Sequence, residues 1–196
     1  MRTTFGTLLA AAVAVTAAAS PVRATAQEGG QTLNGVTLPR EVQVEGQALQ
    51  LNGMALRKKA MFKVYVAGLY LPARTNDANA ILAADAPRRL VLQFVRGVGK
   101  NSMCDALSDG LRNNTPDASA ELKAQFETFC GWMEDIEEGE QFVFTYLPGS
   151  GTTLEVKGQT KGTIPGKEFA DALFKSWIGP KPGPGDGFKR ALLGRE

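Results

Sequence analysis

The order of apolar and polar residues predicts several β-strands. Residues 41–51 alternate Val or Leu with polar side chains, which is the period of a half-buried strand. Residues 60–71 and 89–95 are apolar on both faces, as is typical of strands in the middle of a sheet. A further strand is expected over residues 141–147, and a hairpin over residues 152–164.

Apolar residues recur at helical spacing elsewhere in the chain. The spacing predicts helices through residues 103–111, 122–133 and 169–177, and shorter helices over 77–84 and near 188–193. Strands therefore come first, followed by a pair of helices, further strands and another helix. An α+β fold satisfies this order, with the helices on one face of a mostly antiparallel sheet.

Two proline-containing segments indicate where helices begin and end. Thr115 is a capping residue followed by Pro116, so the helix through 122–133 is expected to begin at Thr115. Gly179 ends the helix through 169–177. The Pro- and Gly-rich residues 180–187 that follow contain no Gly-Lys-Ser/Thr sequence, so they are interpreted as a rigid linker and not as a phosphate loop.

The first 26 residues have the features of a secretory signal peptide. Arg2 gives a positive start, residues 8–19 are apolar or uncharged, and Ala24 and Ala26 fit the small-x-small pattern before a cleavage site. A bilayer-spanning helix needs about 20 apolar residues, so this run is too short for an anchor. No later stretch is long and apolar enough to span a membrane. Cleavage after Ala26 is expected to give a periplasmic or secreted protein.

The mature chain is expected to have two parts. Residues 27–35 are polar and Gly-rich and are interpreted as a flexible arm, and residues 36–196 as a single domain. Loss of Arg2 and Arg23 with the signal peptide leaves 20 basic and 20 acidic residues. This balance does not imply a strongly basic surface of the kind that binds nucleic acid, so no nucleic-acid partner is expected.

The composition excludes several kinds of catalytic and metal site. The chain has no His, which excludes Ser-His-Asp and Cys-His nucleophile pairs and His-ligated metals. Two Cys cannot form a four-cysteine zinc or iron–sulfur site. No cofactor and no metal are therefore predicted.

The two cysteines, Cys104 and Cys130, fall in consecutive predicted helices. A helical hairpin can bring them together, and export favours a disulfide between them. The alternative is two buried free thiols that pack as small apolar groups.

Arg57 is the charged residue with the clearest potential for ligand binding. It ends the segment LNGMALR and leads directly into the long apolar strand. A guanidinium beside such a strand can clamp a carboxylate or polarise a carbonyl. The alternative is an exposed arginine in a basic turn with Lys58 and Lys59.

Two segments carry a resemblance to a known family, residues 51–71 (LNGMALRKKAMFKVYVAGLYL) and 169–182 (FADALFKSWIGPKP). They resemble the chalcone isomerase-like family, and its bacterial exported branch most closely. The similarity continues through residues 88–98, 152–166 and 189–194.

The resemblance implies a fold and a general site. The fold is an open-faced β-sandwich, in which a large antiparallel sheet carries a layer of helices on one face. Family members hold a small, largely apolar ligand in the cleft between sheet and helices. Plant chalcone isomerases cyclise chalcones to flavanones there, and members without that activity bind fatty acids.

Five residues of this chain correspond to positions of the family's pocket. Arg57 stands at the position of the arginine that contacts the ligand's oxyanion or carboxylate. Tyr65 stands where the isomerases have a Thr, Ser102 replaces their Tyr, and Asp109 replaces their Asn. Ser176 matches a position that is Ser or Thr in the isomerases. The arginine is thus retained while its hydrogen-bonding partners differ.

Three functions remain open from the sequence. The first is a non-catalytic binder of an apolar carboxylate such as a fatty acid, with Arg57 pairing the head group and Tyr65 donating a hydrogen bond. The second is an intramolecular lyase or isomerase of the chalcone-to-flavanone type. In that enzyme Arg57 stabilises developing negative charge, and Tyr65 or Asp109 orders water or takes a proton. The third is a structural envelope protein with a vestigial cleft, which a cleft filled by bulky side chains around Arg57 would indicate.

Overall fold

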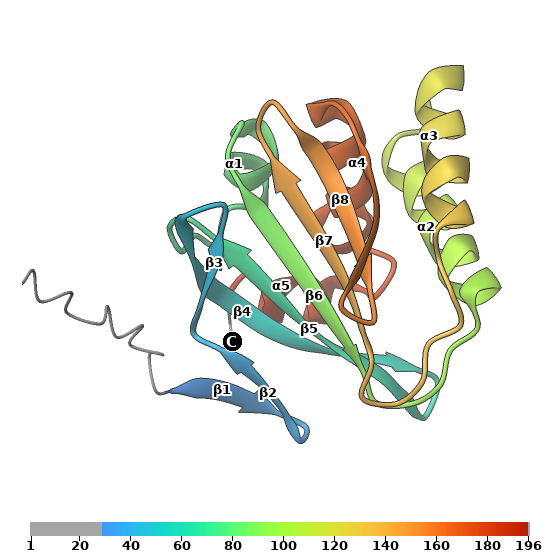
Figure 1. Ribbon diagram of the computed structural model, residues 1–196. Coiled ribbons are helices and arrows are strands. Elements are labelled where there is room, and N and C mark those ends of the chain that lie inside the picture. Colours follow the sequence, from blue (N-terminus) through green and yellow to red (C-terminus); the bar gives the residue numbers. More distant parts are fainter. Residues whose placement is uncertain (1–28, 196) are drawn as a thin grey trace, which may run out of the picture.

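The central feature is an antiparallel sheet of seven strands that follow one another in chain order (Figure 1). The computed structural model describes residues 29–195, and the predicted signal peptide lies outside these residues. The strands are β3 (Glu41–Val44), β4 (Gln47–Lys59), β5 (Phe62–Leu71), β6 (Arg88–Phe94), β7 (Gln141–Leu147), β8 (Gly151–Val156) and β9 (Gln159–Ile164). The predicted strands are confirmed, but the one expected to end at residue 51 continues to Lys59, so Arg57 lies within β4 and a turn separates it from β5.

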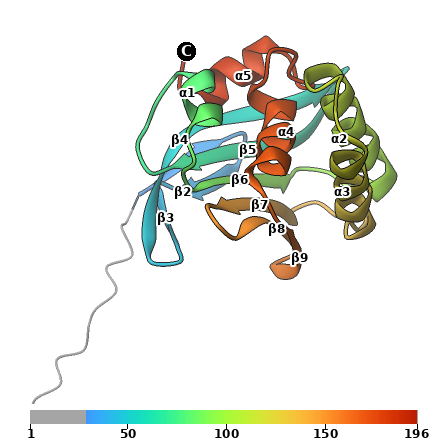
Figure 2. The ribbon, with the colours of Figure 1, turned by 90° about the horizontal axis from the view of Figure 1, so that it is seen from above.

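The helices lie together on one side of the curved sheet (Figure 2). They are α1 (Ala78–Ala83), α2 (Lys100–Asn114), α3 (Ala120–Gly131), α4 (Lys167–Ile178) and α5 (Asp186–Leu192). This arrangement confirms the predicted α+β fold with helices layered on one face. None of the helices between residues 29 and 195 has the length and hydrophobicity needed to cross a bilayer.

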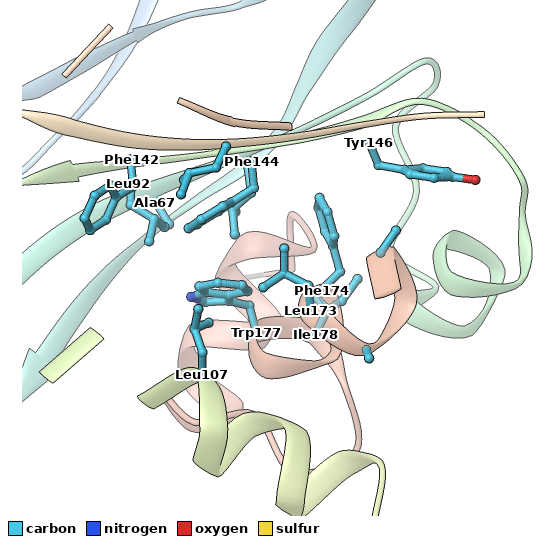
Figure 3. Packing of buried hydrophobic residues seen from close by; sticks show 14 of the residues in the cluster. Ala67, Leu92, Leu107, Phe142, Phe144, Tyr146, Leu173, Phe174, Trp177 and Ile178 are labelled. Atoms are coloured by element: carbon cyan, nitrogen blue, oxygen red, sulfur yellow. The ribbon is translucent and has the colours of Figure 1, made fainter. Parts of the chain in front are cut away.

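The main hydrophobic core lies between the sheet and α4. Trp177 of α4 packs on Phe144 of β7, with ring centroids 5.4 Å apart. Figure 3 shows that Trp177 also faces Leu107 of α2. Phe174 and Leu173 extend the same layer along the helix (Figure 3). Eight of the twelve residues of α4 are buried, so this helix is the centre of the layer.

A buried ion pair fixes the other end of α4. The Arg88 side chain is 1% exposed and pairs with Asp171 of α4. Its guanidinium lies between the rings of Tyr146 and Phe174, 4.9 Å from each centroid. It also donates to the Ile81 carbonyl oxygen at 3.0 Å. A charge at this depth is stable only with such partners, so the ion pair, the two rings and the carbonyl define where α4 lies on β6.

A short hairpin covers part of the opposite face of the sheet. β1 (Gly30–Leu33) pairs with β2 (Val36–Pro39), and Val36 and Leu38 are buried in a second apolar cluster. The flexible arm predicted for 27–35 is therefore wrong for residues 30–35. Asn34 and Gly35 have positive φ angles of 50° and 80°, as the favoured two-residue hairpin turn requires. Residues 27 and 28 lie outside the described residues.

The helix pair differs from the prediction at one boundary. Thr115 does not begin the second helix, because its amide donates to the Leu111 carbonyl oxygen at 2.7 Å and so ends α2. The cap of α3 is Ser119, whose hydroxyl accepts from the Leu122 amide at 3.1 Å. A turn that buries Ala118 separates the two helices.

The predicted disulfide is also corrected, because Cys104 and Cys130 are both free thiols. The helix pair does bring them together, but Cys104 Sγ lies 3.6 Å from the carbonyl oxygen of Cys130 and 3.8 Å from Met133 Sδ. Burial and then the neighbouring Cys104 raise the pKa of the Cys130 thiol. A thiol with a raised pKa stays protonated at neutral pH and is a poor nucleophile, so Cys130 contributes to packing.

Helices α2 and α4 meet at a glycine, Gly110 of α2. A Cβ added to Gly110 of α2 would lie 2.2 Å from Ser176 Oγ and 2.8 Å from Ser176 Cβ. The Ser176 hydroxyl can rotate away, but the Cβ and the Cα behind it cannot. Gly110 therefore sets how closely the two helices approach.

We predict that Gly110→Ala destabilises the fold by up to about 2 kcal/mol. Overpacking typically costs about 1–3 kcal/mol, which exceeds the gain of about 1 kcal/mol when Ala replaces Gly in a helix. Urea denaturation followed by tryptophan fluorescence measures the change. Gly131→Ala at the end of α3 is the control, because its added Cβ meets no atom within 4 Å. Equal stability of the two variants would contradict the close contact.

Candidate functional site

A cavity of about 390 Å³ lies at one end of the helix layer. Its walls come from the ends of β4 and β5, one side of α2, the end of α4 and the loop after α4. All five residues singled out in the sequence line this cavity. The lining residues are Arg57, Lys59, Val64, Tyr65, Val98, Ser102, Met103, Asp105, Ala106, Leu107, Asp109, Asn113, Ser176, Trp177, Gly183 and Pro184.

Arg57 lies on the sheet side of the cavity. It is partly buried and pairs in register with Tyr65 on the neighbouring strand. Within residues 29–195 its guanidinium forms no salt bridge and no side-chain hydrogen bond, whereas Arg88, Arg89 and Arg112 each have a carboxylate partner. Arg57 is therefore the arginine in the cavity wall that has its donors available for a ligand.

Tyr65 lies deeper and is almost completely buried. Its hydroxyl oxygen accepts a hydrogen bond from Trp177 Nε1 at 3.0 Å. Burial raises the pKa of Tyr65 to about 12, although the Trp177 hydrogen bond and the charge of Arg57 both act to lower it. The hydroxyl therefore keeps its proton at neutral pH. Because Trp177 already donates to the oxygen, the Tyr65 hydrogen remains to be donated.

Ser176 forms part of the inner wall between α4 and α2. It is 5% exposed, and its Oγ has no hydrogen-bond partner among the described residues. An unsatisfied buried hydroxyl costs about 1–3 kcal/mol. Its contact with Gly110 shows a packing role, and its position also allows it to bond a polar group that enters the cavity.

Ser102 and Asp109 are on the outer rim. Both are exposed on α2, and Asp109 pairs with Arg112 three residues further along the helix. Asp105 lies between them on the same side of the helix. The cavity thus has basic residues on its sheet side and acidic residues on its helix rim, and Asp109 is held toward the surface by its own ion pair.

The Pro- and Gly-rich loop after α4 closes the cavity. Gly183 and Pro184 line it, although the sequence indicated only a linker. Asn114 at the end of α2 holds the loop through its side chain, which donates to the Lys181 carbonyl oxygen at 2.9 Å and accepts from the Lys181 amide at 2.8 Å. The loop is therefore a fixed wall of the site.

Sequence reasoning missed several lining residues, of which Trp177 has the clearest effect. Its indole determines which hydrogen bond Tyr65 can still make. In the sequence Trp177 marks the apolar face of a helix, and the available signals were its place in the segment 169–182 that carries the family resemblance and its position next to Ser176. The apolar wall of Val98, Met103 and Leu107 was missed because it forms only when α2 folds over the strands.

The arrangement can bind an anion with an apolar body. Two donors, the Arg57 guanidinium and the Tyr65 hydroxyl, come from adjacent strands, and the apolar wall lies beside them. A tyrosine with a pKa of about 12 is a poor proton acceptor at neutral pH. Between residues 29 and 195 no three acidic or cysteine side chains are grouped to hold a metal ion.

Comparison with known proteins agrees with this geometry. The family model described as chalcone isomerase-like matches residues 30–194, which confirms the resemblance seen in the sequence. The crystal structure of a fatty-acid binding protein of Arabidopsis thaliana is similar, with a TM-score of 0.65 and 17% sequence identity. The match covers 81% of this chain and 92% of that chain. At this identity the likeness shows the fold. A comparison with curated proteins found no match.

We predict that no tyrosine of the folded protein ionises at pH about 10, where an unfolded chain loses half of its tyrosine protons. Burial raises the pKa of Tyr65, Tyr70 and Tyr146 to about 12, and these are all the tyrosines of the chain. Between pH about 10 and about 12 the folded state keeps protons that the unfolded state has lost, so stability falls as the pH rises through this window.

Tyrosinate absorbance during an alkaline titration measures this directly. The same titration in concentrated urea is the control and should show three tyrosines ionising near pH 10. Ionisation of a tyrosine near pH 10 in the folded protein, followed by loss of that signal in Tyr65→Phe, would show that Tyr65 is open to solvent.

Proposed function

The chain belongs to the chalcone isomerase-like family, and we propose that it is a non-catalytic binder of a small apolar carboxylate such as a fatty acid. One observation carries the proposal. Arg57, without an ionic partner among residues 29–195, stands opposite a buried tyrosine hydroxyl whose proton is free, at the wall of a largely apolar cavity.

The head group is assigned to Arg57 and Tyr65. A guanidinium can donate two parallel hydrogen bonds to one carboxylate, and such charge-assisted bonds are stronger than neutral ones. Tyr65 adds a neutral donor, oriented because Trp177 already donates to its oxygen. The rim carboxylates Asp105 and Asp109 lie across the cavity on α2, which favours a carboxylate held against the sheet.

The apolar tail is assigned to the wall formed by Val98, Met103, Leu107 and Trp177. Each buried CH₂ contributes about 0.8 kcal/mol, so a chain of several carbons adds more than the head group alone. A cavity of about 390 Å³ is within the range of roughly 300–1,000 Å³ that is usual for small-molecule sites.

Two features favour binding over an isomerase. A cyclisation needs a group that takes or relays a proton. Tyr65 stays protonated at neutral pH because its pKa is raised to about 12, so it cannot take one. Asp109, the alternative, is exposed and paired with Arg112.

The open cavity also weighs against a vestigial cleft, because bulky side chains do not fill the space beside Arg57. The structurally similar Arabidopsis protein is named for fatty-acid binding, which further supports the proposal.

We predict that Arg57→Ala weakens palmitate binding roughly 10- to 150-fold, because a charge-assisted hydrogen bond contributes about 1.5–3 kcal/mol. Binding of methyl palmitate, which has the same tail and no charge, should stay within about threefold of wild type. Titration calorimetry or displacement of a fluorescent fatty acid measures both ligands.

Arg190→Ala is the matched control, since Arg190 is exposed on α5 and does not line the cavity. It should bind palmitate as the wild type does. Equal losses for palmitate and its ester in Arg57→Ala would show that Arg57 supports the fold of the site. An unchanged palmitate affinity would remove Arg57 from the binding site.

Export is the second part of the proposal. The charged start, the apolar run at 8–19 and the small residues before position 27 support cleavage after Ala26. The expected product is a chain that begins at Gln27 and is recovered from the periplasm or the medium.

We predict that Ala24→Leu/Ala26→Leu blocks this cleavage, because the cleavage site requires small residues at both positions. Intact mass and N-terminal sequencing distinguish the 170-residue product from the 196-residue precursor. Thr25→Ser is the control and should be cleaved normally. Full-length wild-type protein in the cytoplasmic fraction would refute export.

A further inference from the structure

The turn between β4 and β5 exposes two large apolar side chains. Met61 is 85% exposed and Phe62 is 55% exposed, and among residues 29–195 no other large hydrophobic side chain is comparably exposed. Lys59 pairs with Phe62 in register, so Ala60 and Met61 form a two-residue turn. We call residues 58–63 the β4–β5 tip. It lies at the edge of the molecule below α2 in Figure 1.

Unpaired cations surround this apolar turn. Residues 57–63 contain four basic residues and no acidic residue. Within the described part of the chain none of them forms a salt bridge, and neither does Arg96, whose guanidinium lies 4.6 Å from the Phe62 ring centroid. All seven ion pairs of the described residues involve other basic residues.

Lys58 and Lys63 stand directly opposite each other in the β4–β5 register. Like charges at opposite positions destabilise a strand pair, and an exposed apolar turn adds no stability to the fold. Acidic residues lie nearby on the loop before β7, where Glu138 shares a shallow hollow with Lys63, and on α2, where Asp105 lines the cavity together with Lys59, but neither forms an ion pair with the tip. The composition of the tip therefore points to a partner outside the chain.

We propose that the β4–β5 tip docks on an anionic lipid membrane, with Met61 and Phe62 inserted among the head groups and Lys58, Lys63 and Arg96 on the lipid phosphates. Large apolar side chains with basic neighbours favour an anionic interface. A two-residue turn is convex, so it can enter a soft head-group layer more readily than it can bury a large flat area against a protein.

The cavity opens beside the tip, and this position favours a membrane over an acidic protein. Lys59 is part of both the tip and the cavity wall. Arg57, which lies two residues before it on β4, also lines the cavity. A docked molecule would have its site next to the lipid surface, from which an apolar carboxylate could enter without crossing bulk water. This choice of partner rests on the proposed function, whereas docking itself does not.

Vesicle co-sedimentation of the chain lacking residues 1–26 tests the proposal. The protein should bind vesicles of equal parts phosphatidylcholine and phosphatidylglycerol, and binding should weaken as salt increases because exposed charges are screened. Lys58→Gln/Lys63→Gln should weaken binding roughly 25-fold, about fivefold for each lysine. Lys123→Gln/Arg190→Gln removes the same charge from exposed positions on α3 and α5 and should leave binding unchanged.

Met61→Ser tests the apolar contribution separately. This side chain is so exposed that its loss should leave the folded structure and its urea midpoint unchanged. Binding to the anionic vesicles should fall roughly tenfold, and Met61→Trp should strengthen it, since tryptophan favours the membrane interface.

Three outcomes would overturn the proposal. They are absence of binding to the anionic vesicles, wild-type binding by both tip variants, and a wild-type dimer that becomes monomeric in Met61→Ser, which would make the tip an interface between copies. Tyr65→Phe separates the two proposals. This variant leaves the tip intact, so it should lose palmitate affinity while still sedimenting with vesicles.

Discussion

The position of α4 on the sheet is the constraint on which the other features depend. At one end the buried Arg88 and Asp171 join the helix to β6, and at the other Trp177 donates to Tyr65 of β5. Both contacts satisfy polar groups that would be costly to bury alone. Because α4 is tied at two points to two strands, its apolar residues meet the sheet in one register, and the helix offers a fixed surface for α2.

The cavity follows from how α2 is placed on that surface. Gly110 lets α2 approach Ser176 closely, while one side of α2 and the ends of β4 and β5 enclose the cavity. The loop after α4 is fixed to Asn114 and closes one side. The site is thus the space left at one end of a tightly packed helix layer, and its shape depends on contacts that also stabilise the fold.

Hydrophobic periodicity predicted most of the fold, because strands buried on both faces and one-sided helices leave distinct patterns. Periodicity gave the wrong result at two places where a local signal, a helix cap or a turn, decides the structure. Thr115 looked like the start of a helix but ends α2, and Asn34 with Gly35 forms a hairpin in a segment too polar to be recognised by its burial. Arg57 was singled out from its place before the long apolar strand, and the family resemblance supplied the other four predicted site residues. Trp177 was missed because its hydrogen bond joins residues 112 positions apart.

The hairpin of β4 and β5 combines two properties that would conflict elsewhere in the fold. Its inner part is covered by helices, so Tyr65 is buried and keeps its proton, while its outer part extends beyond them and exposes Met61 and Phe62. Arg57 stands between these environments and is only partly desolvated. A guanidinium at this boundary can keep its charge without an internal partner and still meet a carboxylate at the cavity wall. A fully buried arginine would need its own carboxylate, as Arg88 does.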